Sequence, residues 1–371
     1  MSQQDSNTDE KAVELWYTRC GAATASALAI RKGWLQQEFD KPGTILHALR
    51  DSTSLATRNS HYNHSQSGMF REGGNIPPIW AKGIGQDTVV VGITWLDEYQ
   101  GILTLADSGI RTVADLRGKR LGVPLYAQAV IDFQRGSAQH GYETALRQAN
   151  LTPQDVTLVD IEAPTYALTD GPRTERREPK EPLEITALLA GQVDAIFTRF
   201  ARGYQLAQDP RFHQVININD LPDHLQRVNN GTPRPITVDR PFLEKNPDVV
   251  VRYLAVLLET AEWAKENRDE VIELLRKDGG DVSREDIIGS HGPDLHLQFE
   301  PKLIPEYILG LEVQKDFLYR WNYFTTDFSV RSWIESWPLA RAQKLVEQRR
   351  ELRREQRKAQ AEEQSEAGKA A

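Results

Sequence analysis

The chain contains a single cysteine, Cys20, in the stretch ELWYTRCGAATASALAIRKGW. An apolar run before it predicts a strand, and the small and polar residues up to Thr24 predict the start of a helix. The thiol would therefore lie at a strand-to-helix turn. A free cysteine is often a buried, inert hydrophobic residue. A thiol near a helix N-terminus and a cation instead ionises readily and can act as a nucleophile. Taken alone, Cys20 leaves both interpretations open.

A second group of reactive residue types follows in NSHYNHSQSGMFREGGNIPPIWAKG. It holds His61, His64, Arg71 and the glycine pair Gly73 and Gly74, ahead of two prolines. Glycines before a helix let backbone N–H groups approach an anion closely, and prolines are favoured in the first helical turn. An arginine adds a planar charged fork that matches a carboxylate, a phosphate or a sulfur oxyanion. The pattern indicates an oxyanion pocket, although an ordinary loop with a surface arginine has the same composition.

The spacing of His61 and His64 also suggests a metal site, because residues i and i+3 can share one face of a helix. A zinc site needs three or four protein ligands, and no third ligand with suitable spacing follows. The serines, asparagines and glycines around the two histidines favour a loop. We therefore expect neither a metal nor an organic cofactor.

Composition and charge exclude several functions. The 371 residues carry a formal net charge of −8, which disfavours a nucleic-acid binder because such proteins need a basic face. One cysteine cannot form an internal disulfide, and no run of about 18 apolar residues exists to span a membrane. The polar residues 1–11 do not have the pattern of a secretory signal. We expect a cytoplasmic monomer that binds a small anion, without nucleic acid and without membrane insertion.

The elements that must position these residues alternate between strand and helix. Residues 13–18 predict a strand, and Thr24 is the expected N-cap of one helix that runs to Phe39. The run DTVVVGITWL predicts a strand buried on both faces, with GILTLADSGI as its neighbour in the sheet. Helix-to-strand units follow in VADLRGKRLGVP, ETALRQANLTPQDVTLVDIE and ITALLAGQVDAIFTRF. The alternation predicts an α/β protein with helices covering its sheets.

Three further segments have a clear pattern. PDVVVRYLAVLLETAEWAKENRDEVIELL predicts an amphipathic helix pair. Residues 163–182 are rich in proline, arginine and glutamate and predict a surface loop. The residues after Trp337 have dense mixed charge and no aromatic side chain, which predicts a helix that frays towards its end.

The segments YTRC, SHYNHSQSGMFREGGNIPP and VVVGITWLDEYQGILTLADSGIRTVADLRGKRLGVP together resemble the aromatic sulfinate desulfinases of the hydroxybiphenyl sulfinate desulfinase type. These enzymes share the fold of the sulfonate, taurine and nitrate substrate-binding proteins of ABC importers. The resemblance implies a type II periplasmic-binding-protein-like fold, with two α/β domains, mixed sheets and an interdomain ligand cleft. With it we expect domain I at 12–118 plus 235–338 and domain II at 119–234. The composition of the two ends predicts a disordered lead at 1–11 and a charged, partly helical or disordered tail at 339–371.

The resemblance also implies a role for each residue of the two reactive groups. The family's catalytic cysteine, histidine, arginine and sulfinate-holding glycine fall on Cys20, His61 rather than His64, Arg71, and Gly74 with Gly73 beside it. Two positions depart from the family pattern. The segment after the cysteine is CGAAT where a proline is usual, and Glu72 stands where an apolar residue is expected.

The implied reaction is hydrolysis of a carbon–sulfur bond in an aryl sulfinate, with release of sulfite. Arg71 and the glycine amides would hold the sulfinate oxygens. Cys20 would attack sulfur as a thiolate or protonate the ring carbon as a thiol, with His61 as the group that orients the thiol or relays its proton. The candidate walls of an aryl pocket are Trp80, Trp95, Tyr99, Tyr126 and Phe200, of which Trp95 and Tyr126 are the predicted substrate contacts.

Two other functions fit the same fold. The first is a non-catalytic receptor of a sulfonate, nitrate or taurine importer, in which Arg71 and Gly74 bind the anion and Cys20 is a bystander. The second is a ligand sensor or a precursor-biosynthesis protein, a class that often carries clustered histidines or several cysteines. This chain has one cysteine.

Overall fold

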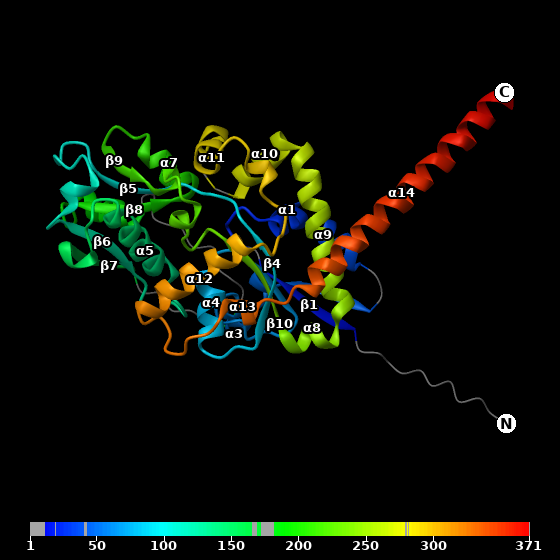
Figure 1. Cartoon of the computed structure of the whole chain (residues 1–371), viewed down its shortest axis with the longest axis horizontal. Coiled ribbons are helices and arrows are strands. Elements are labelled where there is room, and N and C mark those ends of the chain that lie inside the picture. Colours follow the sequence, from blue (N-terminus) through cyan, green and yellow to red (C-terminus); the bar gives the residue numbers. More distant parts are fainter. Residues whose placement is uncertain are drawn as a thin grey trace.

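The protein, described here from a computed structural model, forms two α/β units side by side (Figure 1). The structure describes residues 12–18, 20–40, 43–164, 169–171, 182–278, 280 and 282–370, with side chains as far as residue 364. The predicted lead at 1–11 and most of the predicted surface loop at 163–182 lie outside the described residues. No helix in the described ranges is long and apolar enough to cross a membrane.

Each unit contains a five-stranded mixed sheet. The first sheet has the order β2-β1-β3-β10-β4 and the second β7-β6-β8-β5-β9. The strands are β1 (Val13–Tyr17), β2 (Thr44–Ala48), β3 (Met69–Glu72), β4 (Thr88–Thr94), β5 (Gln100–Leu105), β6 (Arg120–Leu125), β7 (Thr157–Glu162), β8 (Ala195–Arg199), β9 (Phe212–Asn217) and β10 (Arg234–Asp239). In each sheet four strands run in the same direction, and the one strand that arrives from the other unit is inserted antiparallel between two of them, β10 in the first sheet and β5 in the second.

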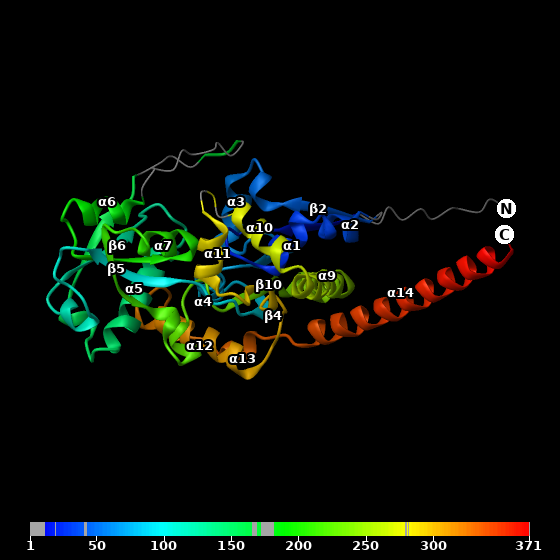
Figure 2. The same cartoon turned by 90° about the horizontal axis from the view of Figure 1, so that it is seen from above.

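The helices cover both faces of the two sheets. They are α1 (Ala25–Arg31), α2 (Trp34–Phe39), α3 (Leu55–Asn63), α4 (Ile76–Gly83), α5 (Phe133–Arg147), α6 (Leu183–Leu189), α7 (Phe200–Ala207), α8 (Arg240–Lys245), α9 (Pro247–Glu266), α10 (Arg268–Asp278), α11 (Arg284–His291), α12 (Pro305–Arg320), α13 (Val330–Trp333) and α14 (Trp337–Ala370). Figure 2 shows α12 and α13 below the two sheets in that view, on the side away from α1 and α3.

β4 is buried along its whole length, as its apolar run predicts. Val89 and Val91 pack in the cluster that includes α1 and α9, whereas Val90 packs on the other face with α4, α12 and α13. The strand is therefore apolar at consecutive positions because both of its faces meet helices.

The predicted pairing of GILTLADSGI with this strand is wrong. β5 lies in the second sheet between β8 and β9, and the antiparallel neighbour of β4 is β10. The chain therefore first crosses between the sheets in residues 95–99, ahead of the residue 118 at which we expect domain I to give way to domain II. Local pattern predicts a strand but not its partner, because pairing depends on residues distant in the sequence.

The predicted helix from Thr24 to Phe39 is two helices, α1 and α2. Thr24 caps α1 as predicted, because its hydroxyl accepts a hydrogen bond from the Ala27 N–H at 3.0 Å. Gly33 has a φ of 72° and separates the helices, a conformation that glycine adopts without the steric penalty of a side chain. The side chains predicted to share the inner face are all buried: Ala25, Leu28, Ala29 and Leu35.

The C-terminal residues form one long helix, α14, which projects from the first unit (Figures 1 and 2). Its beginning packs on α9 through Leu339, Ala342 and Val346, which are buried. Arg349 pairs with Glu38 at 2.8 Å and Glu259 at 3.0 Å. From 351 to 364 every side chain is exposed.

Candidate functional site

Arg71 is held by the backbone on the inner face of β3. Its side chain is 2 % exposed, Nε donates to the His61 carbonyl at 2.9 Å and NH1 donates to the Gly74 carbonyl at 2.7 Å. The remaining nitrogen, NH2, has no hydrogen-bond partner among the described residues. Burial lowers the pKa of Arg71 to about 10, so the group stays charged at neutral pH. Two carbonyls thus fix the direction of a guanidinium that has a donor to spare.

Cys20 lies directly against Gly73. A Cβ atom on Gly73 would lie 2.8 Å from the Cys20 Sγ, 2.9 Å from the Cys20 Cβ and 4.0 Å from the Arg71 NH1. The φ of Gly73 is 153°, a value that side chains rarely allow. The structure therefore brings together the thiol, the glycine pair and the arginine from two separate segments of the chain.

Gly74, the second glycine of the pair, lets the segment that carries Asn230 approach closely. A Cβ on Gly74 would lie 2.8 Å from both polar atoms of the Asn230 amide. The Asn230 Oδ1 accepts from the Ile76 N–H at 3.0 Å, and its carbonyl accepts from the Asn75 N–H at 2.7 Å. Pro77 and Pro78 start α4 as predicted, but they have no N–H to donate. The N-terminus of α4 is thus already occupied, which leaves Arg71 and the glycine amides as the candidate anion donors.

Glu72 points away from the anion site. Consecutive residues of a strand face opposite sides, so Arg71 and Glu72 diverge. The Glu72 carboxylate accepts from the Ser26 N–H at 2.8 Å, from the Ala25 N–H at 3.4 Å and from the Thr94 hydroxyl at 3.0 Å. Burial raises its pKa. The Glu72 carboxylate therefore caps the first turn of α1.

The start of α1 therefore does not stabilise a Cys20 thiolate, although the sequence suggested that a helix N-terminus would. The free N–H groups at the start of α1 are taken by Glu72 and by the Thr24 hydroxyl. The positive charges that act on the thiol are instead those of two arginines, Arg71 and Arg199, which both interact electrostatically with Cys20.

The two histidines lie in a helix and at its end, not in the predicted loop. His61 is in the last turn of α3, and His64 ends it with a φ of 55°. His64 is 3 % exposed, and its Nε2 lies 2.9 Å from the Thr237 hydroxyl. Burial, with a smaller contribution from Arg71, lowers the pKa of His64 to about 3. His64 is therefore neutral and structural, which leaves the half-buried His61 as the candidate proton relay.

In the described part of the chain, no three residues among histidine, cysteine, aspartate and glutamate are grouped so that they could hold a metal ion.

Aromatic rings from the two units lie near Arg199. Tyr62 of α3 stacks on Phe133 of α5, with ring centroids 6.2 Å apart. The Arg199 guanidinium lies 5.7 Å from the Phe133 ring and 4.5 Å from the Phe200 ring. Tyr62 interacts electrostatically with Arg71 in turn.

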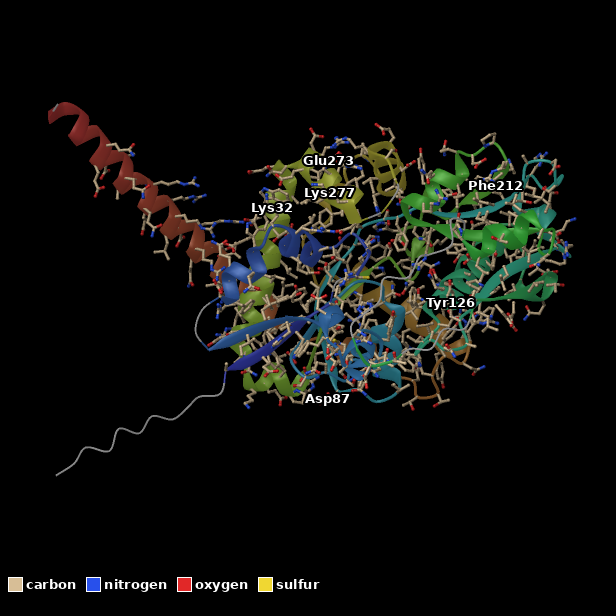
Figure 3. The ribbon with its side chains drawn as sticks, turned by 180° about the vertical axis from the view of Figure 1, so that it is seen from behind. Lys32, Asp87, Tyr126, Phe212, Glu273 and Lys277 are labelled. Atoms are coloured by element: carbon tan, nitrogen blue, oxygen red, sulfur yellow. The ribbon has the colours of Figure 1, made fainter. Side chains whose placement is uncertain are left out.

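Phe200 and Tyr126 were predicted as walls of the pocket, whereas Arg199 and Phe133 beside Phe200 were not. Phe200 has a φ of 60° at the junction of β8 and α7. Tyr126 interacts electrostatically with Arg199, and Figure 3 shows it on the side of the second unit that is nearer the first. The one sequence signal for Arg199 was an Arg-Phe pair at the end of a predicted strand, where ligands of α/β proteins often bind.

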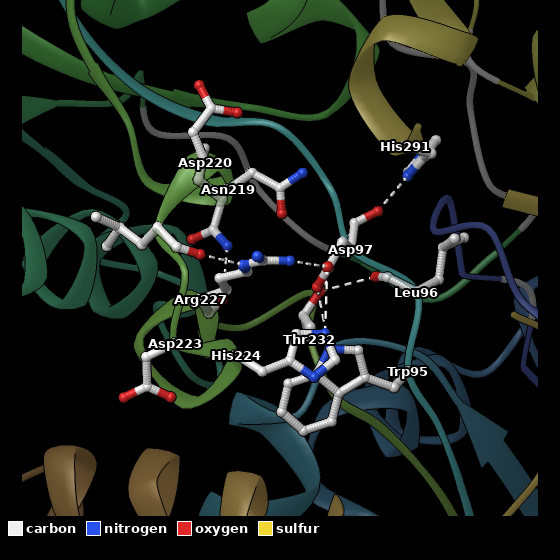
Figure 4. Close-up of polar contacts among 12 residues, drawn as sticks. Trp95, Leu96, Asp97, Asn219, Asp220, Asp223, His224, Arg227, Thr232 and His291 are labelled. Carbon is white, nitrogen blue, oxygen red and sulfur yellow. Dashed lines mark hydrogen bonds and ion pairs between the residues drawn. The ribbon is translucent and has the colours of Figure 1, made fainter. Parts of the chain in front are cut away.

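The other predicted walls are core residues. Trp95 is 2 % exposed and stacks on His224 at 4.4 Å, as Figure 4 shows, and it also packs against Tyr307. Tyr99 donates from its buried hydroxyl to Gln214 at 2.9 Å. Trp80 packs in the apolar cluster under α12 and α13. The ring of Trp95 is thus packed against other side chains in the core, and its role as a substrate contact stays a prediction.

Comparisons with known proteins identify the class. The solved periplasmic aliphatic sulphonate-binding protein SsuA from Escherichia coli is similar with a TM-score of 0.61 and 19 % identity, covering 88 % of this chain and 92 % of that one. Residues 79–171 match the NMT1/THI5 like family. The protein thus has the periplasmic-binding-protein-like fold of two α/β units with mixed sheets, and the predicted fold class is confirmed.

Within this class the chain is homologous to an enzyme. It is 25 % identical over 349 residues to the 2'-hydroxybiphenyl-2-sulfinate desulfinase of Rhodococcus erythropolis, covering 86 % of this chain and 90 % of that protein. A crystal structure of a cysteine-to-serine mutant of the desulfinase DSZB, in complex with biphenyl-2-sulfinic acid, is similar with a TM-score of 0.70 and 23 % identity; it covers 89 % of this chain and 99 % of that one. A putative aliphatic sulfonates-binding protein of E. coli is 29 % identical over 214 residues, covering 56 % of this chain and 54 % of that protein.

Proposed function

We propose that this protein is a desulfinase that hydrolyses the carbon–sulfur bond of an aryl sulfinate and releases sulfite. One observation carries the proposal: the only thiol of the chain lies against Gly73, beside a buried guanidinium with an unused donor. The Arg71 NH2 and the amides of Gly73 and Gly74 would hold the sulfinate oxygens. Donors placed in advance in a dry site stabilise developing charge more strongly than water does.

The reaction consumes only water. An aryl sulfinate and one water give the arene and hydrogensulfite, so that hydrogen replaces the SO2 group on carbon and oxygen is added to sulfur. Cys20 would supply the proton to carbon as a thiol, or bond to sulfur as a thiolate and be released by water. Burial keeps His64 neutral, so it is unsuited to relaying a proton. We therefore assign the proton relay to His61 in either route.

Two comparisons support this proposal over simple binding. The homologous protein over most of the chain is a desulfinase, and the crystallised mutant with a bound sulfinic acid carries serine in place of a cysteine. The aromatic row of Tyr62, Phe133 and Phe200 would also suit an aryl group.

A receptor for sulfonates is the second candidate. It is supported by the aliphatic sulfonates-binding relative and by the SsuA structures. Arg71 and the glycines would bind the anion in the same way, and Cys20 would have no role in the chemistry.

Sulfite release separates the two functions. With biphenyl-2-sulfinate as substrate, we expect sulfite from the wild type and at least a ~1,000-fold slower release from Cys20→Ser, because a serine hydroxyl is neither acidic nor nucleophilic enough to replace the thiol. Binding of the sulfinate, measured by calorimetry, should persist in Cys20→Ser and be lost in Arg71→Met. Equal rates from wild type and Cys20→Ser would contradict the proposal, and binding without sulfite from either would establish the receptor.

A further inference from the structure

Arg199 is a half-buried cation with an unused donor, at the end of β8. Its NH2 donates to the Gln134 Oε1 at 2.6 Å, whereas its NH1 is shielded from solvent and has no hydrogen-bond partner in the part of the chain that the structure describes. The guanidinium lies over the Phe200 and Phe133 rings at 4.5 and 5.7 Å. Arg199 comes from the second unit, whereas Arg71 comes from the first, and both interact electrostatically with Cys20.

Neither Arg71 nor Arg199 has a carboxylate within ion-pair distance among the described residues. The acidic groups that interact electrostatically with Arg199 are Glu98 and Glu184, together with the Cys20 thiol and the Tyr126 hydroxyl. Glu98 is already paired with Arg234 at 2.9 Å, and both of these side chains are buried. Glu184 forms no hydrogen bond with the guanidinium. The site thus holds one buried and one half-buried positive charge, Arg71 and Arg199, and no carboxylate of the described residues contacts either of them.

Burying a cation without a partner is strongly unfavourable. A binding site can retain such charges when the ligand brings the matching negative charge. A sulfinate carries one negative charge and would neutralise Arg71. A second anionic group on the ligand would neutralise Arg199.

We propose that Arg199 binds a second acidic group of the substrate, and that the substrate is an aromatic sulfinate that also carries a carboxylate. This proposal rests on the proposed sulfinate site at Arg71 and Gly74. The substrate would span the junction of the two units, with its ring against Phe133 and Phe200 and one acidic group on each arginine. The guanidinium is suited to a carboxylate because its planar N–H donors match the two oxygens.

The test uses unreactive sulfonates, so that it does not depend on catalysis. The affinities of benzenesulfonate and of the three sulfobenzoate isomers are measured by calorimetry for the full chain. We expect at least one sulfobenzoate to bind the wild type about 10- to 100-fold more tightly than benzenesulfonate, as for a charge-assisted contact. In Arg199→Met this ratio should fall to about one, while the affinity for benzenesulfonate changes by less than about threefold.

The controls separate Arg199 from the fold and from the thiol. Arg202→Met changes an exposed arginine of α7 and should retain the wild-type ratio. Arg199→Lys keeps the charge and should retain part of it, and thermal unfolding of each variant checks that it is folded. In Cys20→Ser the ratio should persist, because a carboxylate contact does not need the thiol.

Three outcomes would overturn the proposal. The first is a wild type with no preference for any sulfobenzoate. The second is Arg199→Met weakening benzenesulfonate as much as the sulfobenzoates, which would place Arg199 on the sulfonate itself. The third is a preference that disappears in Cys20→Ser. If no sulfite is formed from any sulfinate but the Arg199-dependent ratio is found, the desulfinase is refuted and the dianion site stands.

Discussion

Cys20 and Gly73 pack so closely in the candidate site that no side chain fits between them. The thiol occupies the space that a side chain on Gly73 would need. Glycine is required here for two independent reasons, the close approach of the sulfur and the φ of 153°. The position of the thiol relative to Arg71 therefore requires that residue 73 is a glycine.

Replacing Gly73 by alanine should displace the thiol. The new Cβ would lie 2.8 Å from Sγ, so Cys20 must move away from Arg71 or the β3–α4 turn must open. We expect Gly73→Ala to reduce sulfite release at least ~100-fold and to destabilise the fold by about 1–3 kcal/mol. The control is Gly21→Ala, next to the same cysteine, where a Cβ meets nothing within 4 Å. Equal activity of the two variants would show that the contact is unimportant.

At the scale of elements, Glu72 connects β3 to α1. Its carboxylate receives two N–H groups of the helix and the Thr94 hydroxyl of β4. An apolar residue was expected at position 72. The glutamate that stands there lies on the opposite face of β3 from Arg71. It sets where α1 begins, and with it the end of the CGAAT segment that carries Cys20.

Removing this carboxylate should destabilise the protein. Glu72→Ala leaves two helix N–H groups and a buried hydroxyl without partners, which should lower the free energy of unfolding by about 2–4 kcal/mol. Glu72→Gln retains an acceptor and should lose less. Glu14→Ala on the exposed side of β1 serves as the surface control, with a change within about 0.5 kcal/mol. Urea unfolding measures all three, and a Glu72→Ala variant as stable as the control would contradict the assigned role.

At the scale of the molecule, the two segments that connect the units are joined by a charged network (Figure 4). Asp97 lies between β4 and β5, and it accepts from the Arg227 NH1 at 2.7 Å and from the Trp95 Nε1 at 3.0 Å. His224 contacts Asp97 at 3.3 Å and Glu306 of α12 at 3.0 Å. Any relative movement of the two units about these segments would have to rearrange this network.

This network predicts a pH dependence of stability. The hydrogen bond from Asp97, with its charge and that of Glu306, raises the pKa of His224 above its ordinary 6.5. A raised histidine pKa contributes stability that is complete below the unfolded-state value of 6.5 and is lost as the pH rises through the folded-state value. The difference in melting temperature between wild type and His224→Gln should therefore shrink as the pH rises from about 6 to about 8.5. A difference that is constant or grows over this range would contradict the protonated bridge.

Sequence patterns predicted the local structure well where one element alone decides it. The N-cap at Thr24, the prolines that start α4 and the buried run of β4 all depend on neighbouring residues. The patterns failed where distant residues decide, as in the partner of β5 and the helix around His61, which local composition described as a loop. The packing of Trp95 against His224 and Tyr307 likewise depends on residues distant in the sequence.

By itself, the sequence determined the α/β alternation and the set of reactive residue types, because hydrophobic period, caps and unique side chains can be read along the chain. The tertiary structure alone decided which of them meet. It placed Cys20 against Gly73, turned Glu72 onto α1 and brought the charge of Arg199, from the second unit, within electrostatic range of the thiol. These contacts join residues of separate elements, and burial and charge at the site depend on all of them together.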